Sequence, residues 1–363
     1  MKSKVKFPLV LSLALLCLMS GCYFEFDNPE EDEEPHISTE PGKITGEYYS
    51  EFGKSIATDG DHVLVSNFDD IHIFKYNSSG IELIQTIDLD FNYSNFSMIV
   101  YRSELIFGHV DGNGTGTVYI YSRNGDVWEL SQEIRKGRGQ DRFGWSIDID
   151  DETMVIGANS NRSDCDTANT CQGMVYVFEK NDGVWEETQE ILADQSGTGD
   201  WDQTCVGIYG DLMLVGSPTQ PLHLYQFNGV WELLRTEEIH ARKIAHFENN
   251  FMVSGDDDFR AFILEPDGSL LENGISSVNK KGVSWSGEII EMRDSLAIVD
   301  LEPAACKLLQ YGNRQWTVAK VFYADPGENC DFQGMAITDQ HIIIGGMNPE
   351  DYYRYGYVYF RDL

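Results

Sequence analysis

The sequence predicts an all-β protein that is built from seven copies of one four-stranded unit. Three observations lead to this expectation. The 363 residues include 34 Gly, 18 Tyr and 19 Phe, and no stretch repeats apolar residues at the helical period. A short apolar run that ends on a small residue recurs seven times along the chain. Each run is followed by an alternating aromatic strand and, in the first six copies, by a fourth strand.

The apolar run defines the period of the repeat. Aligned on the last residue of the run, the copies are separated by 42, 49, 59, 38, 45 and 46 residues. The aligned positions are Ser66, Gly108, Gly157, Gly216, Ser254, Val299 and Gly345. A near-constant step with one long value indicates seven copies and one loop insertion. Four strands in each copy fit the blades of a β-propeller rather than the turns of a solenoid.

The third copy illustrates the order of the strands. "FGWSIDI" predicts the first strand, "MVIGA" the second, "VYVFEK" the third and "VWEETQEI" the fourth. Four copies carry a tryptophan at the start of the fourth strand: Trp128, Trp185, Trp231 and Trp316. Packing between neighbouring blades demands equivalent residues, so we expect these side chains to be structural rather than a platform for carbohydrate.

The seventh copy stops at its third strand, "YGYVYFRDL". A closed propeller needs the exposed edge of that sheet to be covered. We therefore expect residues 37–49, which precede the first copy, to pair with residues 356–361 and to close the ring.

The first 22 residues differ from the rest of the chain. Three lysines precede an apolar run over residues 7–19, which is the order of a secretory signal. "LMSGC" resembles the bacterial lipobox, which implies a lipoprotein signal peptide over residues 1–21 and a lipidated Cys22. The residue after this cysteine is Tyr23 and not aspartate, which in the Gram-negative sorting pattern resembles the signal for the outer membrane. The alternative is an ordinary cleaved signal in which Cys22 is incidental.

Acidic side chains dominate the remaining chain. Residues 25–36, "EFDNPEEDEEPH", hold seven carboxylates and two prolines, so we expect residues 22–36 to be a disordered tether and residues 37–363 to be the propeller. Without residues 1–21 the chain has 60 acidic and 23 basic side chains, a net charge of −37. Such a surface repels nucleic acid and anionic lipid headgroups, so we expect no nucleic-acid partner and membrane contact through the lipid only. We also expect a monomer.

Five cysteines remain after the signal and the lipid site, and an oxidising compartment makes them disulfide candidates. Cys165 and Cys171 lie in one polar loop, and we expect them to pair. Cys306 and Cys330 are a second candidate pair, which would leave Cys205 as a buried thiol. No CxxC spacing indicates a zinc or redox site.

Phe52-Gly53 and Phe143-Gly144 open the first and third copies. With its strands, "DRFGWSIDIDDETMVIGA" resembles an FG-GAP repeat, the blade unit of the integrin α-subunit propeller and of many bacterial surface proteins. The resemblance covers residues 42–363 and implies a seven-bladed propeller. Integrin-type copies carry a calcium loop between the first two strands. Here those turns are short, as in "TDGDH" and "DDET", and cannot form that cage. We therefore expect no cofactor and no metal, with calcium bound by another loop as the alternative.

Other stretches approach a catalytic or metal-binding pattern without completing it. "DGNGTG", from Asp111, lacks a closing acid, and we expect a turn. Asp148, Asp150 and Asp151 are expected to be strand and turn residues. "GVSWS" at 282 lacks the final glycine of a nucleophile elbow, so no catalytic residue is expected. Packing or hydrogen-bonding roles are expected for the histidines in or beside strands, namely His62, His72, His223 and His341.

A propeller has two unlike faces. We call the face with the connections from strand 2 to 3 and from strand 4 to the next blade the loop face, and the opposite face the turn face. The extra residues of this chain, 158–173, 192–203 and 346–355, fall on the loop face. Exposed aromatic residues in long loops are typical binding anchors, which makes ligand-binding candidates of Trp201, Tyr352, Tyr353 and Tyr355.

Three functions are compatible with these features. The first is a non-catalytic binding or adhesion module that holds a protein or a glycan on the loop face. The second is a lyase or hydrolase that acts on polysaccharide, which requires a convergent cluster of His, Tyr, Arg or carboxylate side chains near the centre of the ring. The third is a scaffold in outer-membrane assembly. The first is our expectation, and it rests on the predicted fold.

Overall fold

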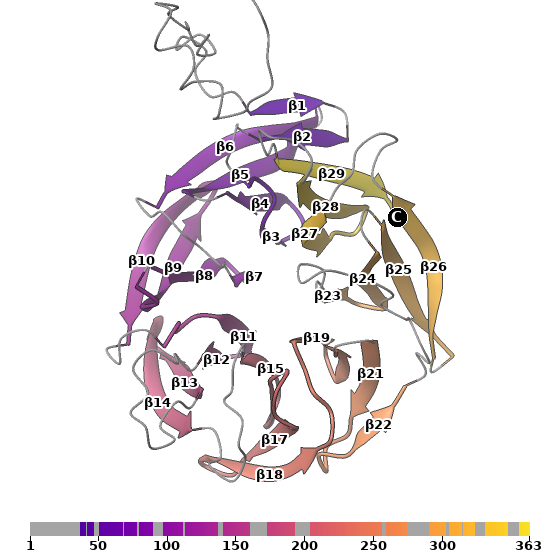
Figure 1. The fold of residues 1–363 in the computed structure, drawn as a ribbon. Coiled ribbons are helices and arrows are strands. Elements are labelled where there is room, and N and C mark those ends of the chain that lie inside the picture. Colours follow the sequence, from indigo (N-terminus) through magenta and orange to yellow (C-terminus); the bar gives the residue numbers. More distant parts are fainter. Residues whose placement is uncertain are drawn as a thin grey trace, which may run out of the picture. The chain divides into compact units, whose positions relative to one another are not determined.

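Seven antiparallel sheets follow one another around a ring (Figure 1). The computed structural model describes 29 strands, and its described residues contain no helix that is long and apolar enough to cross a membrane. The described residues are 37–40, 42–46, 51–67, 69–77, 80–89, 97–111, 113–136, 141–159, 173–192, 204–255, 259–273, 290–302, 305–313, 315–323, 331–347 and 356–363. The seven sheets confirm the seven blades predicted from the repeat.

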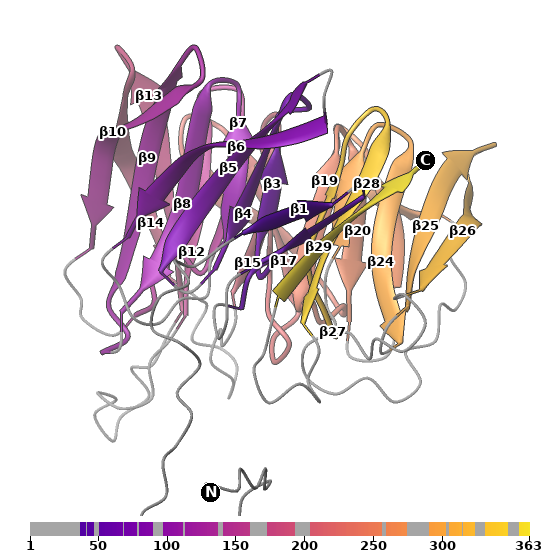
Figure 2. The same cartoon turned by 90° about the horizontal axis from the view of Figure 1, so that it is seen from above.

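In each of the first six blades four strands pair in chain order, from the axis outwards. Blades 1 to 3 consist of β3 (Ile56–Thr58), β4 (His62–Ser66), β5 (Asp70–Asn77), β6 (Gly80–Asp88); β7 (Met98–Tyr101), β8 (Glu104–Val110), β9 (Gly116–Asn124), β10 (Val127–Arg135); and β11 (Ser146–Asp150), β12 (Thr153–Ala158), β13 (Met174–Asn181), β14 (Val184–Leu192). Blades 4 to 6 consist of β15 (Cys205–Tyr209), β16 (Leu212–Gly216), β17 (Leu222–Phe227), β18 (Trp231–Glu237); β19 (Lys243–Phe247), β20 (Asn250–Ser254), β21 (Phe259–Leu264), β22 (Leu270–Glu272); and β23 (Ile290–Arg293), β24 (Leu296–Glu302), β25 (Ala305–Gly312), β26 (Gln315–Tyr323). The strands run between the two faces of the ring (Figure 2).

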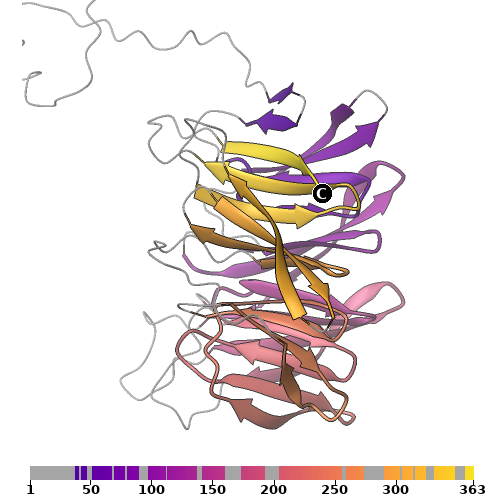
Figure 3. The same ribbon diagram turned by 90° about the vertical axis from the view of Figure 1, so that its right-hand side faces the viewer.

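The seventh blade joins the two ends of the ring. β27 (Asp331–Ile337), β28 (His341–Met347) and β29 (Gly356–Asp362) pair in order, and β2 (Lys43–Thr45) covers the edge of β29 (Figure 3). Lys43 lies opposite Tyr359 and Thr45 opposite Tyr357, which confirms the closure predicted from the sequence. β1 (Ser38–Glu40) adds a fifth strand that the sequence did not predict.

The core lies between blades rather than within them. Seven apolar clusters each combine residues of two neighbouring blades, as where Ile106 and Val118 of blade 2 meet Ile147 and Met154 of blade 3. The four repeated tryptophans are buried in these clusters, which confirms their structural role: Trp128, Trp185, Trp231 and Trp316 are 2%, 3%, 6% and 5% exposed.

A glutamine in the outer strand ties three successive pairs of blades. Gln132 donates to the carbonyl of Trp185 (2.8 Å) and accepts from its N–H (2.9 Å). Gln85 binds Trp128 in the same way, and so does Gln189 with Trp231. Each glutamine follows a β-bulge in the outer strand, and a bulge bends the strand that carries it. The spacing W-x3-Q in "WELSQ" and "WEETQ" is the sequence signal of this clip.

The Phe-Gly pairs form tight corners between blades. Phe143 is fully buried, and Gly144 has a φ of 90°, so the first strand begins at Ser146 and not at Phe143 as predicted. A Cβ on Gly108 would lie 1.9 Å from the carbonyl oxygen of Gly144, and one on Gly116 would lie 1.9 Å from that of Phe143. Only glycine allows so close an approach of two backbones.

The first blade repeats this corner against the last. Cβ atoms on Gly345 and Gly356 would lie 2.1 Å and 2.0 Å from the carbonyl oxygens of Gly53 and Phe52. The Phe-Gly signature therefore docks one blade on two glycines of the blade before it. One of these two corners lies at the point where the ring closes.

Two of the cysteines lie within the described residues. Cys205 and Cys306 are buried, at 5% and 0% exposure, and the Sγ of Cys205 lies 3.5 Å from the carbonyl oxygen of Ala241. Cys22, Cys165, Cys171 and Cys330 lie outside the described residues. Lipidation and both disulfide pairings therefore stay predictions.

Candidate functional site

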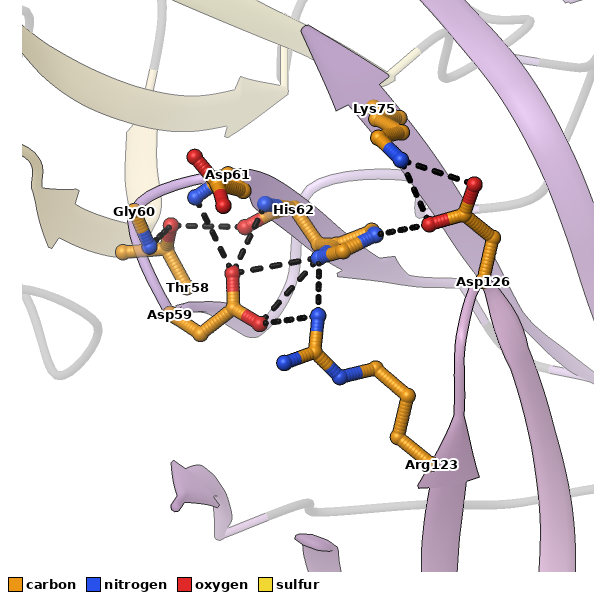
Figure 4. A network of polar contacts seen from close by, with 8 residues as sticks. All are labelled: Thr58, Asp59, Gly60, Asp61, His62, Lys75, Arg123 and Asp126. Atoms are coloured by element: carbon orange, nitrogen blue, oxygen red, sulfur yellow. Dashed lines mark hydrogen bonds and ion pairs between the residues drawn. The ribbon is translucent and has the colours of Figure 1, made fainter. Parts of the chain in front are cut away.

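The turn face of blade 1 holds a histidine between two carboxylates (Figure 4). The Nδ1 atom of His62 lies 3.1 Å from Oδ2 of Asp59, and its Nε2 atom lies 3.2 Å from Oδ1 of Asp126 in blade 2. Asp59 also closes the β3–β4 turn, because its Oδ1 accepts the N–H groups of Asp61 (3.0 Å) and His62 (2.8 Å).

Two cations complete this network. Arg123 lies 3.0 Å from Asp59, and Lys75 donates to both oxygens of Asp126 at 2.5 and 2.7 Å. Hydrogen bonds from Lys75 and His62 lower the pKa of Asp126. The His62 side chain is only 2% exposed, and a general base must reach its substrate. The network therefore clamps blade 1 to blade 2 instead of offering a site for chemistry.

A second polar cluster lies on the innermost strands. On β11, Asp148 accepts the N–H of Ile208 in blade 4 (2.7 Å) and lies 2.9 Å from Nε2 of His246 in blade 5. Asp150 accepts the N–H of Gly210 (2.6 Å). One carboxylate thus connects three consecutive blades. Asp148 and Asp150 are strand residues, as expected, and they serve contacts between blades.

The contacts of His246 favour the protonated form of its imidazole ring. Its Nδ1 lies 3.1 Å from the carbonyl oxygen of Glu248, and its Nε2 faces the Asp148 carboxylate. Both partners are acceptors, so both ring nitrogens donate. Burial alone would lower the pKa of His246, but the charge and hydrogen bond of Asp148 raise it above the ordinary 6.5. The Phe251 ring stacks on the imidazole at 4.8 Å.

Glu291, on β23 of blade 6, is the third member of this axial cluster. Its pKa is raised to about 7, mainly by burial and also by the charge of Asp148, while the cations Lys243, Arg293 and His246 oppose the shift. A carboxyl group that titrates near neutral pH can donate or accept a proton. Asp148, His246 and Glu291 therefore form a charged cluster of the kind that the enzyme hypothesis requires.

The described residues do not bring three metal-ligating side chains together anywhere. In the "DGNGTG" turn, Asp111 Oδ1 accepts the N–H groups of Asn113 (2.9 Å) and Thr115 (2.8 Å). The carboxylate closes its own loop, in agreement with the expected turn. Three of the four histidines expected to pack are buried, and the fourth, His341, stacks on Tyr76 with ring centroids 5.4 Å apart.

The predicted ligand-binding residues Trp201, Tyr352, Tyr353 and Tyr355 lie outside the described residues. The strand ends next to their segments are described. Asn159 Oδ1 accepts the N–H of Thr204 (2.8 Å), and both residues are buried. Asn159 directly precedes residues 160–172, and Thr204 directly follows residues 193–203. This hydrogen bond therefore joins the residue before one long connection of the loop face to the residue after another.

Sequence reasoning missed three arrangements. It did not find the axial cluster, whose members come from blades 3, 5 and 6, or the glutamine clips. It also passed over Trp145, which follows the third-copy Phe-Gly pair and lies under the guanidinium of Arg142, 5.5 Å from Cζ to the ring centroid. The only signal for this last pair is that "RFGW" stands where the first copy has "EFGK".

One repeat of the chain matches a known family. The FG-GAP repeat matches residues 136–178, which include the Phe143-Gly144 corner and most of the first three strands of blade 3. A comparison with curated protein sequences finds no match.

Several solved structures share the fold. A chain of the mitotic checkpoint complex is 14% identical, with 94% of this chain and 98% of that chain covered and a TM-score of 0.57. The Pan2 WD40 domain of Neurospora crassa is 11% identical, with coverages of 85% and 88% and a TM-score of 0.54. Sqt1 of Saccharomyces cerevisiae is 11% identical, with coverages of 87% and 98% and a TM-score of 0.51. At identities this low, the structural likeness shows the propeller fold and leaves the function open.

Proposed function

We propose that the protein is a bacterial outer-membrane lipoprotein, anchored through Cys22, whose propeller is a non-catalytic module that binds a protein or a glycan on the loop face. One observation carries this proposal, namely the contrast between the two faces. On the turn face, short turns use their charges between blades: Arg102 pairs with Asp151 (2.7 Å) and Glu152 (2.5 Å), and Arg293 pairs with Asp339 (2.7 Å).

The loop face is different. Its connections include residues 160–172, 193–203 and 274–289, which belong to the three longest connections between the described strands, and also residues 348–355. Long segments that start and end on rigid strands are the usual location of binding residues. Tyr323, at the loop-face end of β26, is 69% exposed and adds a described aromatic side chain to this face.

Affinity capture from envelope extract tests the proposal. The bait is the detergent-solubilised lipoprotein as wild type, as Trp201→Ala with Tyr353→Ala, and as Tyr209→Ala, a matched aromatic change on the turn face. We expect the double variant to lose a bound component that the wild type and Tyr209→Ala retain, while all three keep the same circular dichroism spectrum. Equal capture by all three would remove the main support for binding on the loop face.

The axial cluster favours one alternative, an enzyme that acts on polysaccharide. Asp148, His246 and Glu291 combine an anion, a cation and a carboxyl group whose pKa is about 7. A screen of glycans with the wild type and with Glu291→Gln separates the two functions. Turnover that Glu291→Gln abolishes would replace the binding proposal, and no turnover by the wild type would leave binding as the function.

A further inference from the structure

The Phe-Gly corner of blade 3 presents an arginine and a tryptophan on the loop face. Arg142 is exposed, has a left-handed φ of 50°, and donates its N–H to the carbonyl of Gly114 in blade 2 (3.0 Å). The N–H of Trp145 points to the carbonyls of Arg142 (3.1 Å) and Gly157 (3.2 Å). These bonds hold the backbone of both residues just before the innermost strand, and Trp145 is half-buried.

Blade 1 has the same corner with different side chains. Glu51 has a φ of 47° and Lys54 follows Gly53, and the Lys54 Nζ atom lies 2.9 Å from Oε2 of Glu51. An ion pair thus occupies in blade 1 the position that the Arg142–Trp145 pair occupies in blade 3. The fold does not require arginine and tryptophan at this corner, because blade 1 forms the same corner with glutamate and lysine.

Arg142 also differs from most cations of this acidic chain. Ten described lysines and arginines besides it make an ion pair with a carboxylate. No carboxylate of the described residues is in ion-pair contact with Arg142, which contacts the Trp145 ring instead. Its guanidinium therefore keeps donors for an external partner.

We infer that Arg142 and Trp145 anchor an acidic segment of a partner protein on the loop face. This inference deepens the proposed function and rests on it. A guanidinium held over an aromatic ring offers its edge N–H groups to a carboxylate in a bidentate geometry. Tryptophan and arginine are the residues most enriched among the anchors of protein interfaces. The remaining surface repels acidic segments, so a local cation selects where they bind.

The position of Arg142 argues against a neutral sugar at this corner. Carbohydrate rings stack on an open aromatic face, whereas the Arg142 guanidinium lies over the Trp145 ring and the ring is half-buried. A carboxylate can approach the guanidinium edge without displacing it. An acidic glycan shares that carboxylate, and the experiment below separates it from a peptide.

Fluorescence anisotropy with two labelled decapeptides tests the inference. One peptide alternates glutamate with leucine, and the other alternates glutamine with leucine. Measurements in about 0.15 M salt screen the net charge of the protein beyond about 8 Å. The key variant is Arg142→Glu with Trp145→Lys, which reproduces the corner of blade 1 and should keep the melting temperature. Arg142→Lys keeps the charge but loses the bidentate geometry, and Arg102→Glu changes a charge on the turn face.

We expect the wild type to bind the glutamate peptide more tightly than the glutamine peptide. The double variant should weaken the glutamate complex by about tenfold or more, since hydrogen bonds to charged groups contribute about 1.5–3 kcal/mol. Arg142→Lys should lose part of the affinity, and Arg102→Glu should lose none. Equal binding by wild type and double variant, or an equal loss in Arg102→Glu, would overturn the inference. Tighter, Trp145-dependent binding of oligogalacturonate would assign the corner to an acidic glycan instead.

The two proposals fail in different ways. If envelope capture depends on Trp201 and Tyr353 but the corner double variant binds the glutamate peptide like the wild type, the loop-face function stands and this inference is wrong. If the corner binds the acidic peptide while envelope capture shows no dependence on the loop face, the general proposal loses its support and the corner remains a peptide site.

Discussion

Replacing Gly108 with alanine would place a methyl group inside the backbone of the next blade. The new Cβ would lie 1.9 Å from the Gly144 carbonyl oxygen, and ordinary contact begins at 3.4 Å, so the two backbones would have to separate by 1.5 Å. Neither atom belongs to a flexible side chain. Overpacking of this kind costs about 1–3 kcal/mol, and the rigid backbone on both sides places Gly108→Ala at the upper end of that range.

Thermal unfolding followed by circular dichroism measures this cost. An unfolding entropy of about 2.1 cal/mol/K per residue over residues 37–363 converts 3 kcal/mol into a decrease of about 4 °C in melting temperature. Gly312→Ala is the matched control, because a Cβ there meets nothing within 4 Å and its φ is ordinary. We expect Gly312→Ala to melt at or slightly above the wild-type temperature. If Gly108→Ala melted with the control, our account of the Phe-Gly corner would be refuted.

Three further predictions address the outer strand, the closure and the axis. Gln132→Ala removes both hydrogen bonds to Trp185 and should lower the free energy of unfolding in urea by about 1–2 kcal/mol. Gln310→Ala, at an exposed strand glutamine, should lower it little, and equal urea midpoints for the two variants would show that the glutamine clip does not stabilise the ring. Ile44→Ala, at a fully buried position in the closing strand, should cost about 2–5 kcal/mol, and a stability like the wild type would show that closure contributes little. The pKa of Glu291 rises on folding from 4.5 to about 7, so the folded protein loses stability as the pH increases through that window. Glu291→Gln should therefore raise the melting temperature at pH 8 and not at pH 4. The same shift at both pH values would contradict this assignment.

The repeated features of the fold could be predicted from the sequence, because every blade buries its faces against its neighbours in the same way. "MVIGA" predicted a second strand that the structure places at Thr153–Ala158. The exceptions are local. Phe143 and Gly144 were assigned to a strand, but the left-handed φ of Gly144 makes them a corner. The three-residue strand Ser38–Glu40 has no alternating apolar pattern that could have revealed it.

The contacts between blades could not be predicted in the same way, since they join residues far apart in the chain. Asp148 and His246 are 98 positions apart, and their contact depends on the register of two blades and on the path around the blade between them. The sequence assigned Asp148 and Asp150 to a strand and its turn, and the structure places both in β11. It offered no signal for the partner of either residue, because a single histidine on an inner strand is no motif.

The pairing of β2 with β29 has a consequence for how the protein acquires its structure during synthesis. Lys43 emerges from the ribosome early, but its partner Tyr359 is made only after all six other blades. The ring therefore stays open until the seventh blade is made, and its closure joins residues that are 316 positions apart. Contacts of such sequence separation form slowly. Until these contacts form, the apolar side chain of Ile44 and the unpaired edge of β29 can both bind other chains.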